Sequence, residues 1–242
     1  MIVVESKENY SQRIANCIAE EIKLRQKFDQ HLVLGLATGS TPIPLYNELV
    51  RLHTEENLSF RNVYTFNLDE YCGLEDNHPK SYHDFMYFHL FNRIDIPREN
   101  IFIPSGQTEP LFERDYCEGY EQTIKDLGGI DIQILGIGRS GHIGFNEPGS
   151  SVDSITRKVK LHDITRRDAA PDFGGFDNVP THAITMGMNT ILSANRIFFM
   201  AFGEAKQEIT KRAFCGEITD DVPASHLQRH KKTTICTDFD IT

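Results

Sequence analysis

The sequence predicts an α/β fold: a single domain with one open, mostly parallel sheet and helices on both faces. Strand-like and helix-like segments alternate along the chain, and strands separated by helices pair in parallel through right-handed crossovers. Most of the strand-like runs are short and apolar, as expected of strands buried on both faces. The 242 residues, 39% of them hydrophobic, can fill one large core, and we expect one domain over residues 1–242.

The elements follow from their hydrophobic periodicity. The first is an amphipathic helix at residues 7–28, in which Ile14, Ile18 and Ile22 recur at helical spacing. Strands rich in β-branched and aromatic residues are expected at residues 31–37, 62–68, 130–137, 196–202 and 232–237. Helices are expected at residues 42–53, 81–91, 115–127 and 204–214. Residues 149–180 are the least regular and predict a long excursion over the sheet's edge, of the kind that forms lids or binding segments.

Composition argues against several classes of protein. The net charge of −10, from 35 acidic against 25 basic residues, argues against a nucleic-acid-binding surface, which needs clustered Lys and Arg. No apolar stretch approaches the ~20 residues that cross a bilayer, and Met1 begins no basic and apolar leader. The five cysteines are scattered without a Cys-x-x-Cys pair, so neither a disulfide framework nor a zinc site is indicated. We expect a cytoplasmic protein without metal, membrane or nucleic-acid partners.

The segment 134–148, Ile-Leu-Gly-Ile-Gly-Arg-Ser-Gly-His-Ile-Gly-Phe-Asn-Glu-Pro, changes from a buried strand into a loop dense with reactive side chains. Its four glycines let the backbone turn and approach a ligand closely. Ligands of open α/β sheets bind outside the carboxyl ends of the strands, so this loop predicts an active site. Ser140, His142 and Glu147 are its candidate functional residues, although His142 alone would equally suit a structural role.

A second strand end predicts an anion site. The segment 36–42, Leu-Ala-Thr-Gly-Ser-Thr-Pro, ends a buried strand and starts a helix at Pro42, so backbone N–H groups and hydroxyls converge at the positive end of that helix. The contributing residues are Thr38, Gly39, Ser40 and Thr41. The alternative is that Thr41 only caps the helix. Lys206 lies in the first turn of a later helix, where it either faces an anion or is a solvated surface lysine.

Two adjacent carboxylates, Asp69 and Glu70, follow the strand at residues 62–68. Adjacent side chains on extended backbone point to opposite sides, so we expect one carboxylate to face the pocket and the other to hold the loop or meet a neighbouring chain. A carboxylate that is partly desolvated in a cleft gains proton affinity and can move a proton between carbon atoms. An acidic surface loop is the alternative interpretation.

Together, these segments resemble the glucosamine-6-phosphate deaminase (isomerase) family. The motifs, in order, are Ala-Thr-Gly-Ser-Thr-Pro at 37–42, Phe-Asn-Leu-Asp-Glu-Tyr at 66–71, the loop at 136–148 and Pro-Ala-Ser-His-Leu-Gln at 223–228. The resemblance extends from about residue 2 to residue 238, and Gly-His-Ile-Gly-Phe-Asn-Glu-Pro is its most specific part. The related phosphogluconolactonases share the fold and the early phosphate loop, but the Asn-Leu-Asp-Glu-Tyr block favours the deaminase branch. The resemblance implies a Rossmann-like fold of the sugar-phosphate isomerase type.

The activity that the resemblance implies is the conversion of glucosamine 6-phosphate and water into fructose 6-phosphate and ammonia. This is a hydrolase-class reaction of N-acetylglucosamine catabolism, without metal or organic cofactor. The resemblance gives ring opening to His142, with Ser140 and Glu147 beside it, and proton transfer from C2 to C1 to Asp69. Residues 38–41 and Lys206 would hold the phosphate of this phosphorylated amino sugar. A homo-oligomer is expected, as in many family members.

Several positions leave alternatives open. Ser140 stands where many members have Asp or Asn, and Ala170 stands where the family commonly has a phosphate-binding Arg, with Arg166 and Arg167 as candidate replacements. Four further residues resemble an effector site for an N-acetylated sugar phosphate, or form a solvated basic face: Ser150, Ser151, Arg157 and Lys160. The alternatives to a glucosamine 6-phosphate deaminase are an enzyme for galactosamine 6-phosphate, a lactonase, and a sugar-phosphate-binding regulator without turnover.

Overall fold

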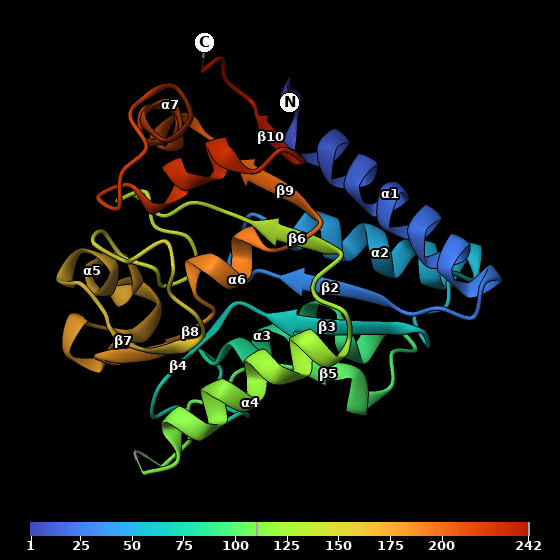
Figure 1. The fold of residues 1–242 in the computed structure, drawn as a ribbon, viewed down its shortest axis with the longest axis horizontal. Helices are drawn as coiled ribbons and strands as arrows, with labels where there is room; N and C mark the ends of the chain where they lie inside the picture. Colours follow the sequence, from blue (N-terminus) through green and yellow to red (C-terminus); the bar gives the residue numbers. More distant parts are fainter. Residues whose placement is uncertain (110, 242) are drawn as a thin grey trace.

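The computed structural model describes residues 1–109 and 111–241, and its central feature is a seven-stranded sheet in which every strand pair is parallel (Figure 1). The strands, in spatial order, are β1 (Ile2–Val4), β10 (Thr233–Thr237), β9 (Arg196–Ala201), β6 (Ile132–Leu135), β2 (Leu32–Leu36), β3 (Val63–Asn67) and β5 (Ile101–Phe102). Every residue of β2, β6 and β10 is buried, which explains why all of them except Gln133 of β6 are apolar or β-branched. The predicted open parallel α/β sheet is confirmed.

Helices cover both faces of this sheet (Figure 1). Their bounds are α1 (Lys7–Lys27), α2 (Ile43–Glu56), α3 (Tyr82–His89), α4 (Glu113–Asp126), α6 (Met188–Leu192) and α7 (Gln207–Cys215). One core cluster joins α1, α2 and α3 to the sheet through residues such as Leu34, and a second joins α4, α6 and α7 through residues such as Val33. Successive side chains on a strand point to opposite faces, so one strand serves both cores.

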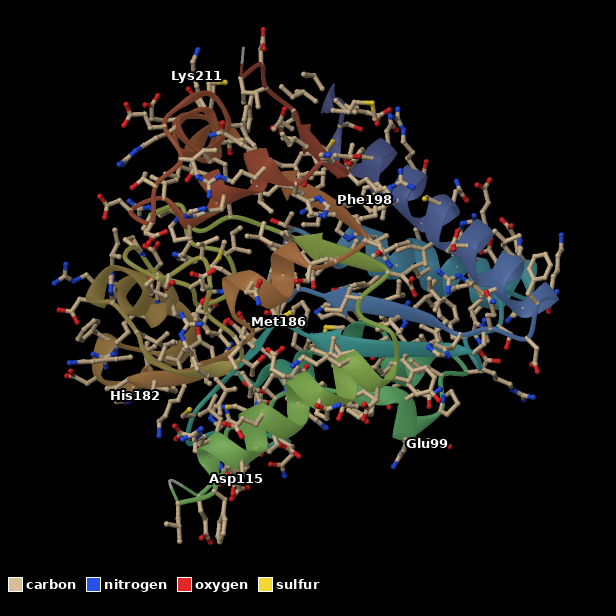
Figure 2. All side chains as sticks on the ribbon, in the orientation of Figure 1. Glu99, Asp115, His182, Met186, Phe198 and Lys211 are labelled. Carbon is tan, nitrogen blue, oxygen red and sulfur yellow. The ribbon has the colours of Figure 1, made fainter. Side chains whose placement is uncertain are left out.

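Side chains fill the space between these layers (Figure 2). Phe198 of β9, for example, lies between the sheet and α1, where its ring meets Tyr10 edge-on at a centroid distance of 6.4 Å. Short 3-10 turns lie at Phe91–Arg93, Arg98–Asn100, Phe176–Asn178, Glu204–Lys206 and Pro223–Arg229. Within the described part of the chain, we find no helix with the length and apolar character needed to cross a bilayer.

A second, three-stranded antiparallel sheet lies beside the carboxyl end of β3. It consists of β4 (Asp69–Tyr71), β8 (His182–Thr185) and β7 (Arg157–Lys160), with α5 (Asp163–Phe173) packed against it. The expectation that residues 149–180 are irregular was therefore wrong, because they contain β7 and α5. The strand β7 reads Arg-Lys-Val-Lys and is only half-buried, and α5 contains Pro171 and ends at the left-handed Gly174, so neither element shows a strong periodicity.

Candidate active site

The predicted functional segments meet in one pocket of about 270 Å³ at the carboxyl ends of β2, β3 and β6. Of the residues expected from the sequence, the pocket is lined by Thr38, Gly39, Ser40, Thr41, Asp69, His142 and Lys206. The chain runs outward from β2 to β3 and β5 on one side, and from β6 to β9 and β10 on the other. The pocket therefore lies at the point where the strand order reverses, which is the usual ligand site of open α/β sheets.

The loop after β2 leaves the first N–H groups of α2 available to a ligand. Pro42 is the N-terminal cap residue of α2, and no side chain caps this helix, which excludes the alternative that Thr41 serves only as its cap. Gly39 adopts a φ of 90°, a conformation that favours glycine. Lys7 of α1 donates a 2.7 Å hydrogen bond to the carbonyl of Ser40, which ties the loop to α1. A fixed loop at a helix N-terminus can bind an anion.

Lys206 reaches the same pocket from the segment after β9. The structure places it at the end of the 3-10 turn Glu204–Lys206, just before α7, rather than within the helix as predicted. Its Nζ donates a 2.8 Å hydrogen bond to the carbonyl of Ile137, which fixes its position. Burial lowers the pKa of Lys206. Since an ammonium group has three N–H donors, two remain for a phosphate.

Asp69 and Glu70 point in different directions, as predicted. Asp69 lines the pocket and is 6% exposed. Glu70 instead accepts backbone hydrogen bonds from Tyr71 (2.8 Å), Tyr82 (3.0 Å) and His83 (2.9 Å), and so holds the start of α3. Burial, helped by the charge of Glu70, raises the pKa of Asp69 to about 8. A carboxylate with this proton affinity is a stronger base than an exposed aspartate.

His142 lies across the pocket, with Ser140 and Glu147 on its Nδ1 side. The hydroxyl of Ser140 lies 2.8 Å from Nδ1, and Oε2 of Glu147 lies 3.5 Å from it. Neither Ser140 nor Glu147 lines the pocket, so each can influence a bound ligand only through the imidazole of His142. Burial lowers the pKa of His142, and the nearby charge of Glu147 opposes this effect. Nε2 is the nitrogen away from these partners.

Two glycines of the 134–148 loop permit close contacts that the sequence did not predict. A Cβ at Gly138 would lie 1.9 Å from Cε1 and Nε2 of His142, so only glycine lets the imidazole lie there. Gly144 has a φ of 57°, and a Cβ there would lie 3.2 Å from Oδ2 of Asp69. Both residues line the pocket, as does Tyr82, the first residue of α3, which was not among the expected site residues.

Arg166 and Arg167 were the candidates for the role of the phosphate-binding arginine that is absent at Ala170, but neither lines this pocket. Arg166 donates to the carbonyls of Phe176 and Val179, and its guanidinium lies 4.1 Å from the centroid of the Phe176 ring. Arg167 is exposed on α5. Ala170 packs against the cluster around Tyr71. These contacts show that α5 is held locally by Arg166.

The residues of the expected effector site lie together. Ser150, Ser151, Arg157 and Lys160 line a cavity of about 330 Å³ that shares Glu147 with the His142 side of the site. The guanidinium of Arg157 donates a 3.0 Å hydrogen bond to the side chain of Asn146. In the described residues, 1–109 and 111–241, we find no group of three His, Cys, Asp or Glu side chains arranged to hold a metal ion.

Comparisons with known proteins find close relatives of this chain. A glucosamine-6-phosphate deaminase of Bacillus pumilus is 44% identical over 98% of this chain and 96% of its own, and glucosamine-6-phosphate deaminase 1 of Bacillus subtilis is 47% identical over 96% and 93%. A solved structure of a monomeric glucosamine-6-phosphate deaminase superimposes with a TM-score of 0.92 at 44% identity, covering 100% of this chain and 97% of that one.

More distant structures share the fold alone. A 6-phosphogluconolactonase from Plasmodium vivax superimposes with a TM-score of 0.73 at 19% identity, over 97% of this chain and 88% of that one. The sequence model of the glucosamine-6-phosphate isomerases and 6-phosphogluconolactonases matches residues 5–236. Because the family model and the relatives match nearly the whole chain, and the fold is shared, the chain belongs to the glucosamine-6-phosphate isomerase/6-phosphogluconolactonase family.

Proposed function

We propose that this protein is a glucosamine-6-phosphate deaminase, a single domain that converts glucosamine 6-phosphate and water into fructose 6-phosphate and ammonia. The observation that carries the proposal is that Asp69, His142 and Lys206 line one pocket together with the loop at residues 38–41. A hexose phosphate carries its anion at C6 and its reacting carbons at the other end. It therefore needs an anion site and acid–base groups in the same cavity.

The phosphate binds between the loop at residues 38–41 and Lys206. The N-terminus of α2 supplies N–H donors and a favourable dipole, and the ammonium of Lys206 supplies a full positive charge. Anchoring the phosphate aligns C1 and C2 with the catalytic groups, because a bound substrate loses the freedom to tumble. The binding energy of the phosphate thus supports a reaction that takes place at the far end of the sugar.

Ring opening is carried by His142. Its neutral imidazole accepts the proton of the C1 hydroxyl at Nε2 and returns a proton to the ring oxygen, and the C1–O bond to the ring oxygen breaks. Ser140 and Glu147 hold the other nitrogen, Nδ1, and so fix the orientation of the ring. The carboxylate of Glu147 also stabilises the imidazolium that forms between the two transfers.

Isomerisation and deamination are carried by Asp69. Its carboxylate removes the proton from C2 of the open aldose, giving an enolamine, and returns a proton to C1, giving an imine at C2. Water adds to this imine carbon, and the C–N bond then breaks to release ammonia and leave the ketone of fructose 6-phosphate. A single carboxylate serves both carbons because C1 and C2 are adjacent, and the raised pKa of Asp69 suits it to the first step.

The decisive experiment is a measurement of products. Purified protein is given glucosamine 6-phosphate, and ammonia and fructose 6-phosphate are quantified in equal amounts if the proposal holds. Tight substrate binding without either product would point to the sugar-phosphate-binding regulator. Comparing kcat/KM for glucosamine 6-phosphate and galactosamine 6-phosphate separates the two epimers, which differ in the configuration of one hydroxyl.

A homo-oligomeric state and a cytoplasmic location stay predictions. Light scattering after gel filtration tests the oligomeric state.

A further inference from the structure

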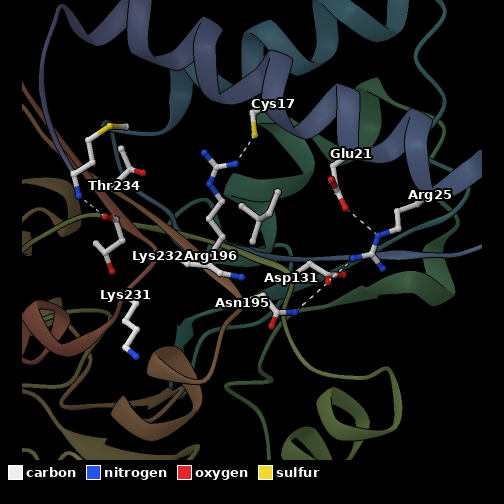
Figure 3. Close-up of a pocket in the computed structure, with 12 residues that line it drawn as sticks. Cys17, Glu21, Arg25, Asp131, Asn195, Arg196, Lys231, Lys232 and Thr234 are labelled. Atoms are coloured by element: carbon white, nitrogen blue, oxygen red, sulfur yellow. Dashed lines mark hydrogen bonds and ion pairs between the residues drawn. The ribbon is translucent and has the colours of Figure 1, made fainter.

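A further cavity lies at the opposite ends of the strands of the main sheet, at the amino ends of β6, β9 and β10 (Figure 3). This groove has a volume of about 610 Å³, and α1 forms its other wall with Cys17, Glu21 and Arg25. The pocket of the proposed deaminase site lies at the carboxyl ends of the strands and shares none of its lining residues with the groove. Any ligand of the groove is therefore a second ligand of the protein.

The charge of the groove is opposite to that of the whole chain. Its lining holds four cationic side chains and two carboxylates. The cations are Arg25, Arg196, Lys231 and Lys232, and the carboxylates are those of Glu21 and Asp131. The protein as a whole has a net charge of −10. Local positive charge on an acidic protein attracts anions to that place.

The carboxylates of the groove are already engaged by other groups. Oδ1 of Asp131 accepts hydrogen bonds from Arg25 (2.8 Å) and Asn195 (3.3 Å), and its Oδ2 accepts one from the backbone of Val33 (3.0 Å). Glu21 pairs with Arg25 at 3.0 Å. These contacts form a closed network in the wall of the groove (Figure 3). They leave the remaining cations, and Arg196 above all, without a carboxylate among the described residues.

The side chain of Arg196 is fixed in place but uses few of its hydrogen-bond donors. Its guanidinium lies 4.4 Å from the centroid of the Phe198 ring and donates one hydrogen bond, of 3.0 Å, to the thiol of Cys17 (Figure 3). A thiol is a weak acceptor, and a guanidinium has five N–H donors in a rigid fork that matches phosphate oxygens. Because the stacked ring already orders the side chain, an anion that binds here loses little free energy to side-chain ordering.

We propose that this groove binds the phosphate group of a small phosphorylated metabolite through Arg196 and Lys232. The dianion of a phosphate monoester matches the excess of positive charge, and the groove is large enough to hold an organic group attached to that phosphate. The thiol of Cys17, in direct contact with Arg196, gives a local reporter of occupancy that does not depend on turnover.

The test measures alkylation of Cys17 by iodoacetamide, with peptides separated by mass, in the presence of inorganic phosphate, glucose 6-phosphate or adenosine 5′-monophosphate. At about ten times its Kd, a bound monoester slows labelling of Cys17 about tenfold. Labelling of Cys215, an exposed thiol on α7, is unchanged and serves as the internal control. If inorganic phosphate alone protects, the site recognises the bare anion; if only one organic monoester protects, its organic group is recognised as well.

The variant Lys232→Gln removes one proposed contact without touching Cys17, and we expect it to abolish the protection while the free protein is labelled at the same rate. Lys211→Gln, on the outer side of α7, is the matched control and keeps the protection. Turnover of glucosamine 6-phosphate is unaffected by either change, so failure of this proposal is distinguishable from failure of the proposed deaminase function. Protection that chloride reproduces at equal ionic strength, or that survives in both Lys232→Gln and Arg196→Gln, overturns the proposal.

Discussion

The hydroxyl of Ser140 is the nearest side-chain partner of Nδ1 of His142, at 2.8 Å, while the carboxylate of Glu147 lies at 3.5 Å. A neutral hydroxyl can donate to an unprotonated nitrogen or accept from a protonated one, whereas a carboxylate only accepts. Ser140 therefore orients the imidazole without favouring its charged form. This arrangement agrees with a pKa of His142 below its usual value, since burial is the largest effect and the more distant charges of Glu147 and Asp168 only oppose it.

Replacing Ser140 by Asp places a carboxylate next to Nδ1, and we expect the pKa of His142 to rise by about 1–3 units. The measurement is an NMR titration of the imidazole. Ser140→Asn, which has similar size and no charge, is the control and leaves the pKa near that of the parent protein. A pKa that is the same in the Asp and Asn variants would mean that Nδ1 does not face this position.

Asp69→Asn removes the proposed base for the C2 proton but keeps the shape of the side chain. We expect kcat to fall by about 10²–10⁴-fold, while binding of fructose 6-phosphate stays within about twofold. Steady-state kinetics and calorimetry supply the two numbers. If kcat is unchanged, Asp69 is not the base.

The same variant has a pH-dependent effect on stability. The pKa of Asp69 rises from 3.8 to about 8 on folding, so at intermediate pH the unfolded chain has lost a proton that the folded protein keeps. The contribution of the protonated Asp69 carboxyl group to the free energy of unfolding is fully present below its pKa in the unfolded chain. It is lost as the pH rises through its pKa in the folded protein. Asn does not titrate, so the Tm of Asp69→Asn exceeds that of the parent protein most at pH 8, and the difference shrinks toward pH 5. A constant difference would contradict the raised pKa.

The charge of Glu70 contributes to the raised pKa of Asp69, after burial. In the parent protein, kcat/KM is expected to rise with pH as Asp69 ionises, with a midpoint near 8. Glu70→Gln removes the charge, so we expect the midpoint of the kcat/KM profile to move to lower pH. Because Gln still offers an oxygen to the backbone of α3, circular dichroism should show the same helix content. A shift in the opposite direction would argue against electrostatic coupling between the two carboxyl groups.

Lys206→Ala removes a charge-assisted contact to the phosphate. Such contacts contribute about 1.5–3 kcal/mol, so KM is expected to rise by about 10–100-fold. Competition by inorganic phosphate weakens in parallel. The matched control is Lys211→Ala, an exposed lysine on α7 (Figure 2), which leaves both quantities unchanged. An effect on kcat alone would instead mean that the phosphate contact forms only in the transition state.

Gly138→Ala tests the close approach of the imidazole to the backbone. The added Cβ would lie 1.9 Å from the ring of His142, so the ring must move and activity is lost. Gly119→Ala is the control, because an added Cβ meets nothing within 4 Å there and the residue lies in α4. That change is expected to stabilise the protein by about 1 kcal/mol with full activity. Retained activity in Gly138→Ala would show that His142 has room to shift without loss.

The sequence predicted five of the seven strands of the main sheet from their hydrophobic pattern, and it missed the short edge strands β1 and β5. Strands buried on both faces, such as β2, are continuous apolar runs, and helices such as α1 repeat apolar residues at helical spacing. The sequence also predicted that the 38–41 loop, Asp69 and His142 share an edge, since the carboxyl ends of parallel strands meet at one edge of the sheet. The second sheet was missed, because β7 is half-buried and charged, and its pairing with β8 depends on a distant segment.

The sequence by itself therefore determined the fold class and most of the polar side chains that gather at the pocket, Tyr82 being an exception. Only the tertiary structure decided which of them touch: that Ser140 is closer to the imidazole than Glu147, that Glu70 binds the start of α3, and that Arg166 is held on α5. It also decided that Arg196 and Lys232 share a groove with Cys17 of α1. The physical reason is that periodicity records the burial of each residue, whereas contacts depend on the packing of elements that are far apart in the chain.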